Sequence, residues 1–302
     1  MPEFAGTMLR RRELGNALRR IRDERGMTIV EVTEAMKDRY GSSFSTTKLS
    51  RMETAQRNAI PRDVHDLCIL YAVADDERER LVELARELHK VATPVTDAHM
   101  RGYLWFADYE AVATSIREYT AMYVPGLLQT PGYARVVENL QVAAPDYYSP
   151  RLEREDIPKN AEDRVTLRLK RQDVLERSDP PFLHVVLDES VLRRRLPDPD
   201  VMNTQLDHLV EMSKRSNISI QIIPFEAGLY PGSECSYWSI LDFPRTDNMP
   251  PTSIYAESAT GAQIIDRDTD IARMISAFEV LTRLALDPDT SRDRITSTRA
   301  ME

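Results

Sequence analysis

The stretch from Phe44 to Asn58, FSTTKLSRMETAQRN, constrains the fold more than any other part of the chain. Leu49 and Met52 mark a thin apolar stripe at helical spacing, and Ser45 stands before them as a natural N-cap. Phe44 and Leu49 occupy the two positions of a hydrophobic staple. The rest of this predicted helix carries small hydroxyls and cations. It should therefore be buried on one side and present hydrogen-bond donors on the other.

Helical patterns flank this stretch on both sides. A first helix is indicated by apolar residues at i, i+3, i+4 and i+7 spacing, namely Leu14, Ala17, Leu18 and Ile21. Thr28 and Glu31 form the capping box of a second helix, and Pro61 suits the first turn of a fourth. Asp75 or Asp76 should cap a fifth. The sequence therefore predicts an all-α domain of five helices over residues 8–88.

A change of pattern follows this domain. Residues 89–102 lose helical periodicity and contain Pro94 and Gly102, so they are predicted to be a linker. Beyond the linker, helical patterns alternate with short β-rich runs. The helical patterns cover residues 103–121, 131–141, 160–177, 199–215 and 268–286, and the β-rich runs cover 182–188, 218–225, 236–243, 252–257 and 262–265.

The last three β-rich runs follow each other closely, which favours a small antiparallel meander. Residues 103–287 are therefore predicted to form an α+β effector and dimerisation domain, and residues 288–302 a tail. The fold class expected for the whole chain is multidomain, with an all-α head and an α+β body.

Charge is spread unevenly along the chain. Residues 8–62 hold 13 basic and 7 acidic side chains, a net charge of +6, whereas the rest of the chain holds 27 and 42, a net charge of −15. A basic head on an acidic body is expected when one domain alone meets phosphate. On charge alone, solvated arginine-rich helix faces are the favoured explanation.

The predicted location is cytoplasmic, in association with the nucleoid. No apolar run approaches the roughly 18 residues that a membrane span needs, and the N-terminus has no secretory apolar core. Cys68 and Cys235 lie far apart, and Cys68 falls at an apolar helix position. A buried free thiol in a reducing compartment is therefore expected at Cys68.

The second and third helices, joined by a turn, are typical of a helix-turn-helix whose second member enters the DNA major groove. Thr46 and Thr47 are slim donors with methyl groups that can meet thymine, and Arg51 can reach guanine or clamp a phosphate. Lys48, Ser50 and Arg57 are better placed for contacts to the DNA backbone. The candidate DNA-binding residues are Thr28, Ser45, Thr46, Thr47, Lys48, Ser50, Arg51 and Arg57.

Residues 14–88 resemble the XRE (Cro/repressor-like) helix-turn-helix family, whose third helix typically runs S-x-x-x-h-S-R-h-E-x-G, with h apolar. The matching residues here are Ser45, Leu49, Ser50, Arg51, Met52 and Glu53. The resemblance implies double-stranded operator DNA as a partner. A single such module makes few contacts, so a homodimer on a palindromic operator is expected.

Three features depart from the family pattern. Ala55 stands where the family usually has glycine, so the third helix is expected to run on rather than turn through a left-handed residue. Ile29 takes a position where a glutamine often contacts phosphate. The connection over residues 37–43 is longer than the usual tight turn.

The second domain is similar to the C-terminal effector domain of WhiJ-like developmental regulators of actinobacteria. The similar segments are YVPGLLQTPGYAR (123–135), RLKRQDVL (168–175), VVLDESVLRR (185–194), QLDHLVEMSKRSNISIQIIPFEAG (205–228) and AFEVLTRLALD (277–287). The resemblance implies a transcriptional repressor whose second domain answers to a small BldB-like or antitoxin-like protein partner. It implies no ligand site at the level of residues.

Other constellations are weaker. Asp266, Asp268 and Asp270 lack the glycine of a calcium loop and are interpreted as helix-capping residues. Asp188 and Glu189 are adjacent and should diverge at a strand end rather than form a catalytic pair. The five histidines show no metal spacing. No enzyme activity, cofactor or metal is predicted.

Two alternatives to a DNA-binding regulator stay open. One is a protein-interaction, antitoxin-like module with little DNA binding. The other is a small-molecule receptor in residues 103–287.

Overall fold

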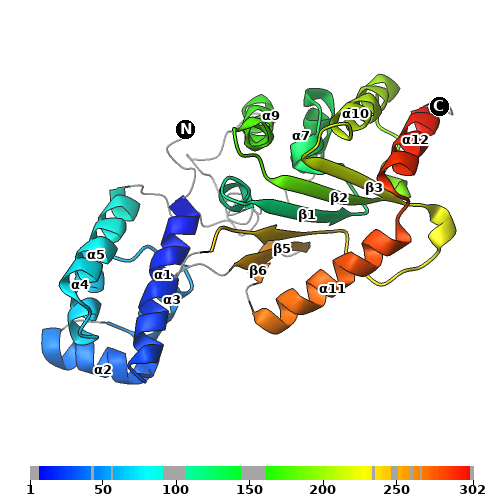
Figure 1. Cartoon of the computed structure of the whole chain (residues 1–302). Coiled ribbons are helices and arrows are strands. Elements are labelled where there is room, and N and C mark those ends of the chain that lie inside the picture. The colour runs from blue at the N-terminus through cyan, green and yellow to red at the C-terminus, as the bar shows by residue number, and fades with distance from the viewer. Residues whose placement is uncertain are drawn as a thin grey trace. The chain divides into compact units, whose positions relative to one another are not determined.

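The computed structural model describes residues 7–41, 44–55, 57–90, 106–143, 161–232, 235–245, 251–258, 261–265 and 267–299. The chain divides into two compact units (Figure 1), one containing residues 1–96 and the other most of residues 97–302. The predicted class, a helical head followed by an α+β body, is confirmed. Most of the predicted linker lies outside the described residues, although His89 and Lys90 still belong to a helix.

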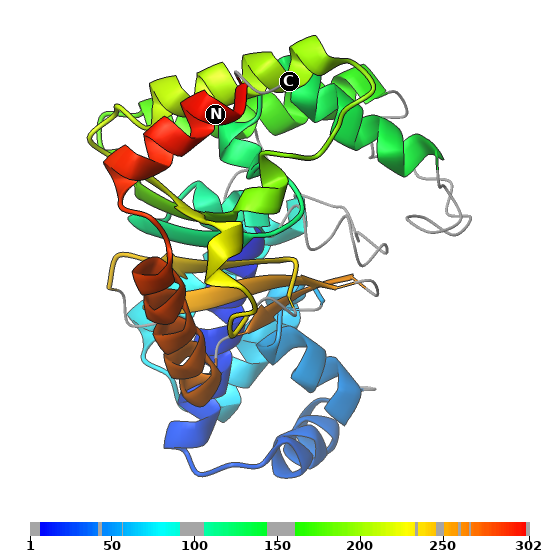
Figure 2. The same ribbon diagram turned by 90° about the vertical axis from the view of Figure 1, so that its right-hand side faces the viewer.

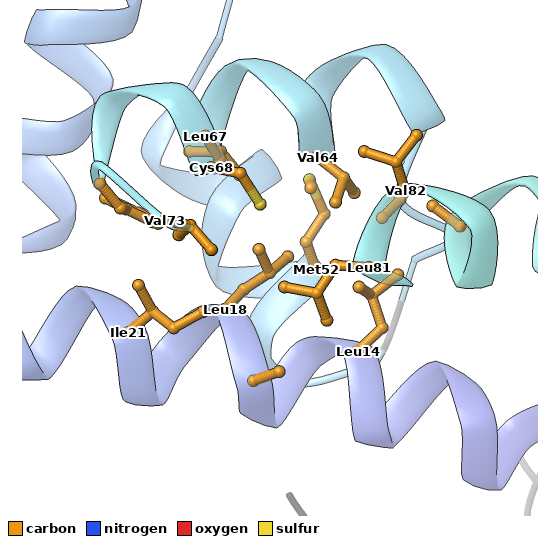
Figure 3. Packing of buried hydrophobic residues seen from close by; sticks show 14 of the residues in the cluster. Leu14, Leu18, Ile21, Met52, Val64, Leu67, Cys68, Val73, Leu81 and Val82 are labelled. Carbon is orange, nitrogen blue, oxygen red and sulfur yellow. The ribbon is translucent and has the colours of Figure 1, made fainter. Parts of the chain in front are cut away.

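The first unit is helical throughout its described residues. Its elements are α1 (Thr7–Glu24), α2 (Ile29–Tyr40), α3 (Thr46–Glu53), α4 (Pro61–Leu70) and α5 (Asp75–Lys90). Side chains from these helices share one apolar core (Figure 3), to which Leu14, Leu18, Met52, Leu67 and Leu81 contribute. Cys68 is a buried free thiol, as predicted, and burial raises its pKa to about 11. Pro61 opens α4 as expected.

The turns on either side of α3 differ from expectation. Helix α2 runs on to Tyr40 and stops at Gly41, whose φ of 60° is left-handed, so the connection to α3 is shorter than the one expected over residues 37–43. Helix α3 ends at Glu53, and Ala55 adopts a φ of 58°. The expectation that α3 runs on is therefore wrong. Ala55 is buried at 4% exposure, and this packing holds alanine where glycine is usual.

A second alanine, Ala72, also has a left-handed backbone, with a φ of 51°. It lies in the turn after α4, where Val73 N–H donates to Cys68 O at 2.9 Å, as in a Schellman motif. Unlike Ala55, it is exposed and has no buried methyl group to lose.

We therefore expect Ala72→Gly to raise the free energy of unfolding by about 0.5–1 kcal/mol, because relief of left-handed strain exceeds the added entropy of the unfolded chain. Ala55→Gly is the matched comparison and should gain less. Denaturant unfolding followed by circular dichroism measures both, and a destabilised Ala72→Gly variant would contradict this reading of the turn.

The second unit is built on a six-stranded sheet in the order β3-β2-β1-β4-β5-β6. The strands β1 (Ser115–Thr120), β2 (Phe182–Asp188) and β3 (Ile218–Ile223) are parallel. The strands β4 (Tyr237–Asp242), β5 (Thr252–Ser258) and β6 (Gly261–Ile265) continue the sheet as an antiparallel meander. The predicted meander is thus present, as one half of a larger mixed sheet.

Helices cover both faces of this sheet, as Figure 2 shows. The helices α7 (Pro131–Ala143), α9 (Ala161–Lys170) and α10 (Pro199–Met212) lie on one side, and α11 (Asp268–Leu284) lies on the other. Phe278 and Leu281 of α11 pack into a core with Trp238 and Tyr119. None of the helices within the described ranges is long and apolar enough to cross a membrane.

Two segments of the second unit differ from the sequence-based assignment. Residues 103–121 were expected to be helical, but only residues 106–110 of the described part are, and Ser115–Thr120 form β1 at the centre of the sheet. The polar pair Arg117 and Glu118 conceals the strand pattern. Most of the expected tail forms helix α12 (Pro288–Arg299), with Ile295 fully buried.

Candidate nucleic-acid interface

Local capping fixes both helices of the predicted helix-turn-helix. Thr28 Oγ1 accepts from Glu31 N at 3.2 Å, and Glu31 Oε2 accepts from Thr28 N at 2.7 Å. Thr28 Oγ1 also donates to Glu31 Oε2 at 2.8 Å, and the two bonds that the carboxylate accepts from Thr28, the backbone one first, hold the pKa of Glu31 below its ordinary value. At α3, Ser45 Oγ accepts from Lys48 N at 3.1 Å. The predicted capping box and the predicted N-cap are both present, so Thr28 and Ser45 mark helix starts.

Helix α3 is divided sharply between a buried and an exposed side. Leu49 is 0% and Met52 2% exposed, and both pack against Phe44 in the core. The opposite side is a single stripe, because positions 46, 47, 50, 51 and 54 fall within about 140° at 100° per residue. Of the stripe residues, Thr46, Thr47, Arg51 and Thr54 are exposed and Ser50 is half-buried.

Lys48 lies between the two sides and is already engaged. Its Nζ is 2.7 Å from Asp63 Oδ2 of α4, and both side chains are less than 20% exposed. The same ammonium lies 4.7 Å from the centre of the Phe44 ring. This pairing fastens α3 to α4 and weighs against the predicted role of Lys48 as a free contact to the DNA backbone.

A buried ion pair anchors the inner side of α3. Glu53 is 4% exposed, and its two carboxylate oxygens accept from Arg22 Nε at 2.7 Å and from Arg22 Nη2 at 2.8 Å. Arg22 belongs to α1 and also donates to Met27 O at 2.9 Å. The bonds to Glu53 raise the pKa of the Arg22 guanidinium. Sequence reasoning placed Glu53 in the family motif but did not find its partner.

Helix α1 also approaches α3 through Gly15. A Cβ atom at this position would lie 2.6 Å from Met52 O and 2.8 Å from Glu53 O. Both neighbours are backbone atoms that cannot rotate aside, so only glycine fits. The end of α3 is thus held by a close backbone contact and by an ion pair, and the orientation of its exposed stripe follows from both.

The charge exposed around α3 is positive. Glu53 is the one carboxylate between Phe44 and Asn58, and Arg22 neutralises it. Arg51 and Arg57 are exposed, and within the described residues no carboxylate pairs with either. Arg62, whose side chain is 80% exposed, lies at the start of α4, where its Nε is 3.8 Å from Asp66 Oδ2. Its place next to Pro61, in the first turn of a predicted helix, was a signal that sequence reasoning did not use.

Two family models match the chain. One, described as a helix-turn-helix domain, matches residues 13–81. The other, described as a domain of unknown function (DUF5753), matches residues 103–297, well over half of the chain. The chain belongs to the DUF5753 family. No curated protein and no solved structure matches it.

The helix-turn-helix match and the stripe on α3 together support a DNA-binding regulator. The DUF5753 description names no function, so the resemblance to WhiJ-like regulators stays a prediction.

The segment VPGLLQT of the DUF5753 domain forms a fixed loop rather than a free surface. Thr130 precedes α7 at Pro131, and its Oγ1 accepts from Tyr133 N at 3.4 Å. The side chains of three glutamines bind the loop backbone: Gln129 donates to Val124 O, Gln172 to Gly126 O and Gln129 O, and Gln205 to Leu128 O. Leu127 and Leu128 are at most 1% exposed. This loop is therefore a poor docking site for a partner.

The acidic constellations of the second domain have structural roles. Asp188 accepts from Ser190 N and from the Tyr230 hydroxyl. Glu189 is 1% exposed and accepts from Arg193 and Arg294.

The aspartates at the start of α11 lie in its first turn, but the N-cap is Arg267 and makes no side-chain cap bond. Asp268 and Asp270 therefore stabilise α11 through their charge near the positive end of the helix dipole, and they do not cap the helix as expected. Asp266 lies outside the described residues. In the part of the chain that the structure describes, no group of three or more His, Cys, Asp or Glu side chains could hold a metal ion.

Proposed function

We propose that the chain is a sequence-specific transcriptional repressor of the XRE type, similar to WhiJ-like regulators. It binds a palindromic operator as a homodimer, and its DUF5753 domain responds to a small BldB-like or antitoxin-like protein or to a ligand. The role proposed for that domain is binding rather than catalysis, since Asp188 and Glu189 are both held in hydrogen bonds to neighbouring parts of the domain.

The observation that carries the proposal is the exposed stripe on α3. Thr46, Thr47 and Arg51 project from a helix whose other side is locked into the core, and no carboxylate faces outward with them. Short hydroxyl side chains and a free guanidinium are donors that can reach base edges and phosphates in the major groove. An exposed helix face with no binding role usually carries acidic as well as basic side chains, and the exposed side of α3 carries no acidic one.

Arg51→Ala tests the proposed orientation of α3. The variant should lose about 1–3 kcal/mol of affinity for the preferred site and relax the preference at one base pair, because Arg51 faces the groove. Selection from random double-stranded DNA by the parent chain defines the site. Titrations of parent and variant at several salt concentrations then measure the loss.

Arg57→Ala is the matched control for Arg51→Ala. It should weaken binding to all sequences alike and lower the slope of log affinity against log salt by about one. Equal affinity of Arg51→Ala and parent for every site would show that α3 is oriented differently. Failure of the parent to select any sequence would favour the protein-interaction alternative.

A further inference from the structure

The two edge strands of the six-stranded sheet, β3 and β6, differ in whether other parts of the chain bind their outer backbone groups. At the β3 edge, Ile222 O accepts from Leu286 N at 2.9 Å, and Ile222 N donates to Ser291 Oγ at 3.0 Å. Leu286, before α12, and Ser291, within α12, therefore satisfy both backbone groups of Ile222 on β3. At the other edge (Figure 1), β6 pairs with β5 and with no other strand of the described residues.

The sequence of β6, GAQII, contains no charged residue and no proline. Charges, particularly lysine, and proline are the usual means by which natural proteins prevent an edge strand from pairing with another chain. The absence of charge is notable in this domain, because residues 103–302 hold 22 basic and 32 acidic side chains, a net charge of −10. Two acidic bodies could approach each other here without opposing like charges on the paired strands.

The order of residues along β6 makes the strand complementary to itself. In an antiparallel pair of two copies centred on Gln263, Ala262 stands opposite Ile264 of the second copy, and Gly261 stands opposite its Ile265. Each large side chain thus meets a small one, and the two Gln263 amides meet each other and can exchange hydrogen bonds. Such a pair has the two-fold symmetry of an isologous dimer.

We propose that β6 is the dimer interface, where it pairs antiparallel with β6 of a second copy and joins two six-stranded sheets into one. This inference rests on the proposed homodimer and specifies where it forms. The required symmetry is the same two-fold symmetry that a palindromic operator has.

Paired charge substitutions at Gln263 test the interface. Gln263 is exposed, so Gln263→Glu and Gln263→Lys should both fold. In either variant two like charges lie about 5 Å apart across the pair, and the dimer dissociation constant should rise at least about fivefold. An equimolar mixture of the two variants places opposite charges together and should restore the dimer. Analytical ultracentrifugation at one salt concentration measures all three samples.

Controls separate a local effect from a change of net charge. Thr296→Glu and Thr296→Lys make the same changes on the exposed side of α12 and should leave the dissociation constant unchanged. In a chain whose exposed Cys235 is replaced by serine, Gln263→Cys should form a disulfide between two copies, since directly opposed Cβ atoms lie within disulfide range.

The possible failures are distinguishable. A parent chain that stays at its monomer mass of 34.6 kDa would overturn both the proposed homodimer and this interface. A dimer that is insensitive to both Gln263 charges, and that forms no disulfide in the Gln263→Cys variant, would overturn the interface and leave the homodimer standing. A mixture that stays dissociated would overturn the antiparallel pairing.

Discussion

Replacing Glu53 with alanine is expected to lower the free energy of unfolding of the helical domain by about 3–5 kcal/mol, because it leaves Nε and Nη2 of the buried Arg22 guanidinium without their acceptor, and the bond from Nη1 to Asp23, whose side chain is 55% exposed, does not replace them. Arg22 is 8% exposed and cannot turn to water without disturbing α1. A domain of this size has a total stability of roughly 5–15 kcal/mol. The change would therefore remove a large part of that stability and loosen α3 at the same time.

The two domains can be followed separately in the intact chain. Both tryptophans, Trp105 and Trp238, lie outside residues 1–96, so tryptophan fluorescence reports the DUF5753 domain, whereas circular dichroism also records the helical domain. In Glu53→Ala, part of the dichroism should be lost at lower denaturant, with the fluorescence transition unchanged.

The control is Glu13→Ala, which removes a partly exposed pair with Arg80 and should cost no more than about 1 kcal/mol. Equal effects of the two variants would show that the Arg22–Glu53 pair does not anchor α3.

The sequence predicted the helical domain well because its signals are local. Thr28, Ser45 and Pro61 each mark a helix start through a residue within three positions, and the apolar stripes repeat at helical spacing. The same local rules failed at Ala55. Its backbone is left-handed although it is not glycine, the residue by which such a helix end is usually recognised in a sequence.

The contacts that fix the orientation of α3 could not be predicted from the sequence, because they join residues that are distant in the chain. Arg22 and Glu53 are separated by 31 positions, and both are charged residues that a local reading assigns to the surface. Gly15 could not be recognised as a contact with α3 from the sequence. A glycine inside a helix indicates a close approach only once the position of the opposing backbone is known. The pairing of Lys48 with Asp63 was hidden in the same way.

In the DUF5753 domain, strands with apolar sequences were predicted almost to the residue, whereas β1 was missed. Its central residues are ionisable, and each has a hydrogen-bond partner that is distant in the sequence. Arg117 donates to Asp242 at 3.0 Å, and Glu118 accepts from Tyr237 at 2.9 Å. A strand buried on both faces usually reads as a continuous apolar run, so these exceptions concealed it.

Glu118 itself leads to the last expected result. It is 1% exposed, and Oε2 has no hydrogen-bond partner within the described residues. Burial, and next the neighbouring Glu110 carboxylate, raise the pKa of Glu118 to about 8, although the Tyr237 hydroxyl bond and Arg171 act in the opposite direction. Arg171 binds Glu110 through two bonds of 2.8 Å, so its charge is already balanced. Glu118 is therefore protonated in the folded domain at neutral pH.

The sign of the resulting pH dependence follows from the raised pKa. The stabilising contribution of protonated Glu118 is complete below its ordinary pKa and is lost as pH rises through the folded value of about 8. Glu118→Gln keeps an acceptor for Tyr237 and cannot ionise, so it should not lose this contribution. The difference in free energy of unfolding between the variant and the parent should therefore increase with pH. Between pH 4 and pH 7 the increase should be on the order of 3 kcal/mol in favour of the variant, at about 1.4 kcal/mol per pH unit.

Tryptophan fluorescence during denaturant unfolding, repeated from pH 4 to pH 9, measures this difference in the domain that contains Glu118. Glu211→Gln is the matched control, because the Glu211 side chain is 68% exposed on α10 and the variant should show no comparable gain. A stability difference between Glu118→Gln and the parent that does not change with pH would mean that Glu118 is ionised in the folded domain. Its free oxygen would then need a cationic or hydrogen-bonding partner beyond those that the described residues supply.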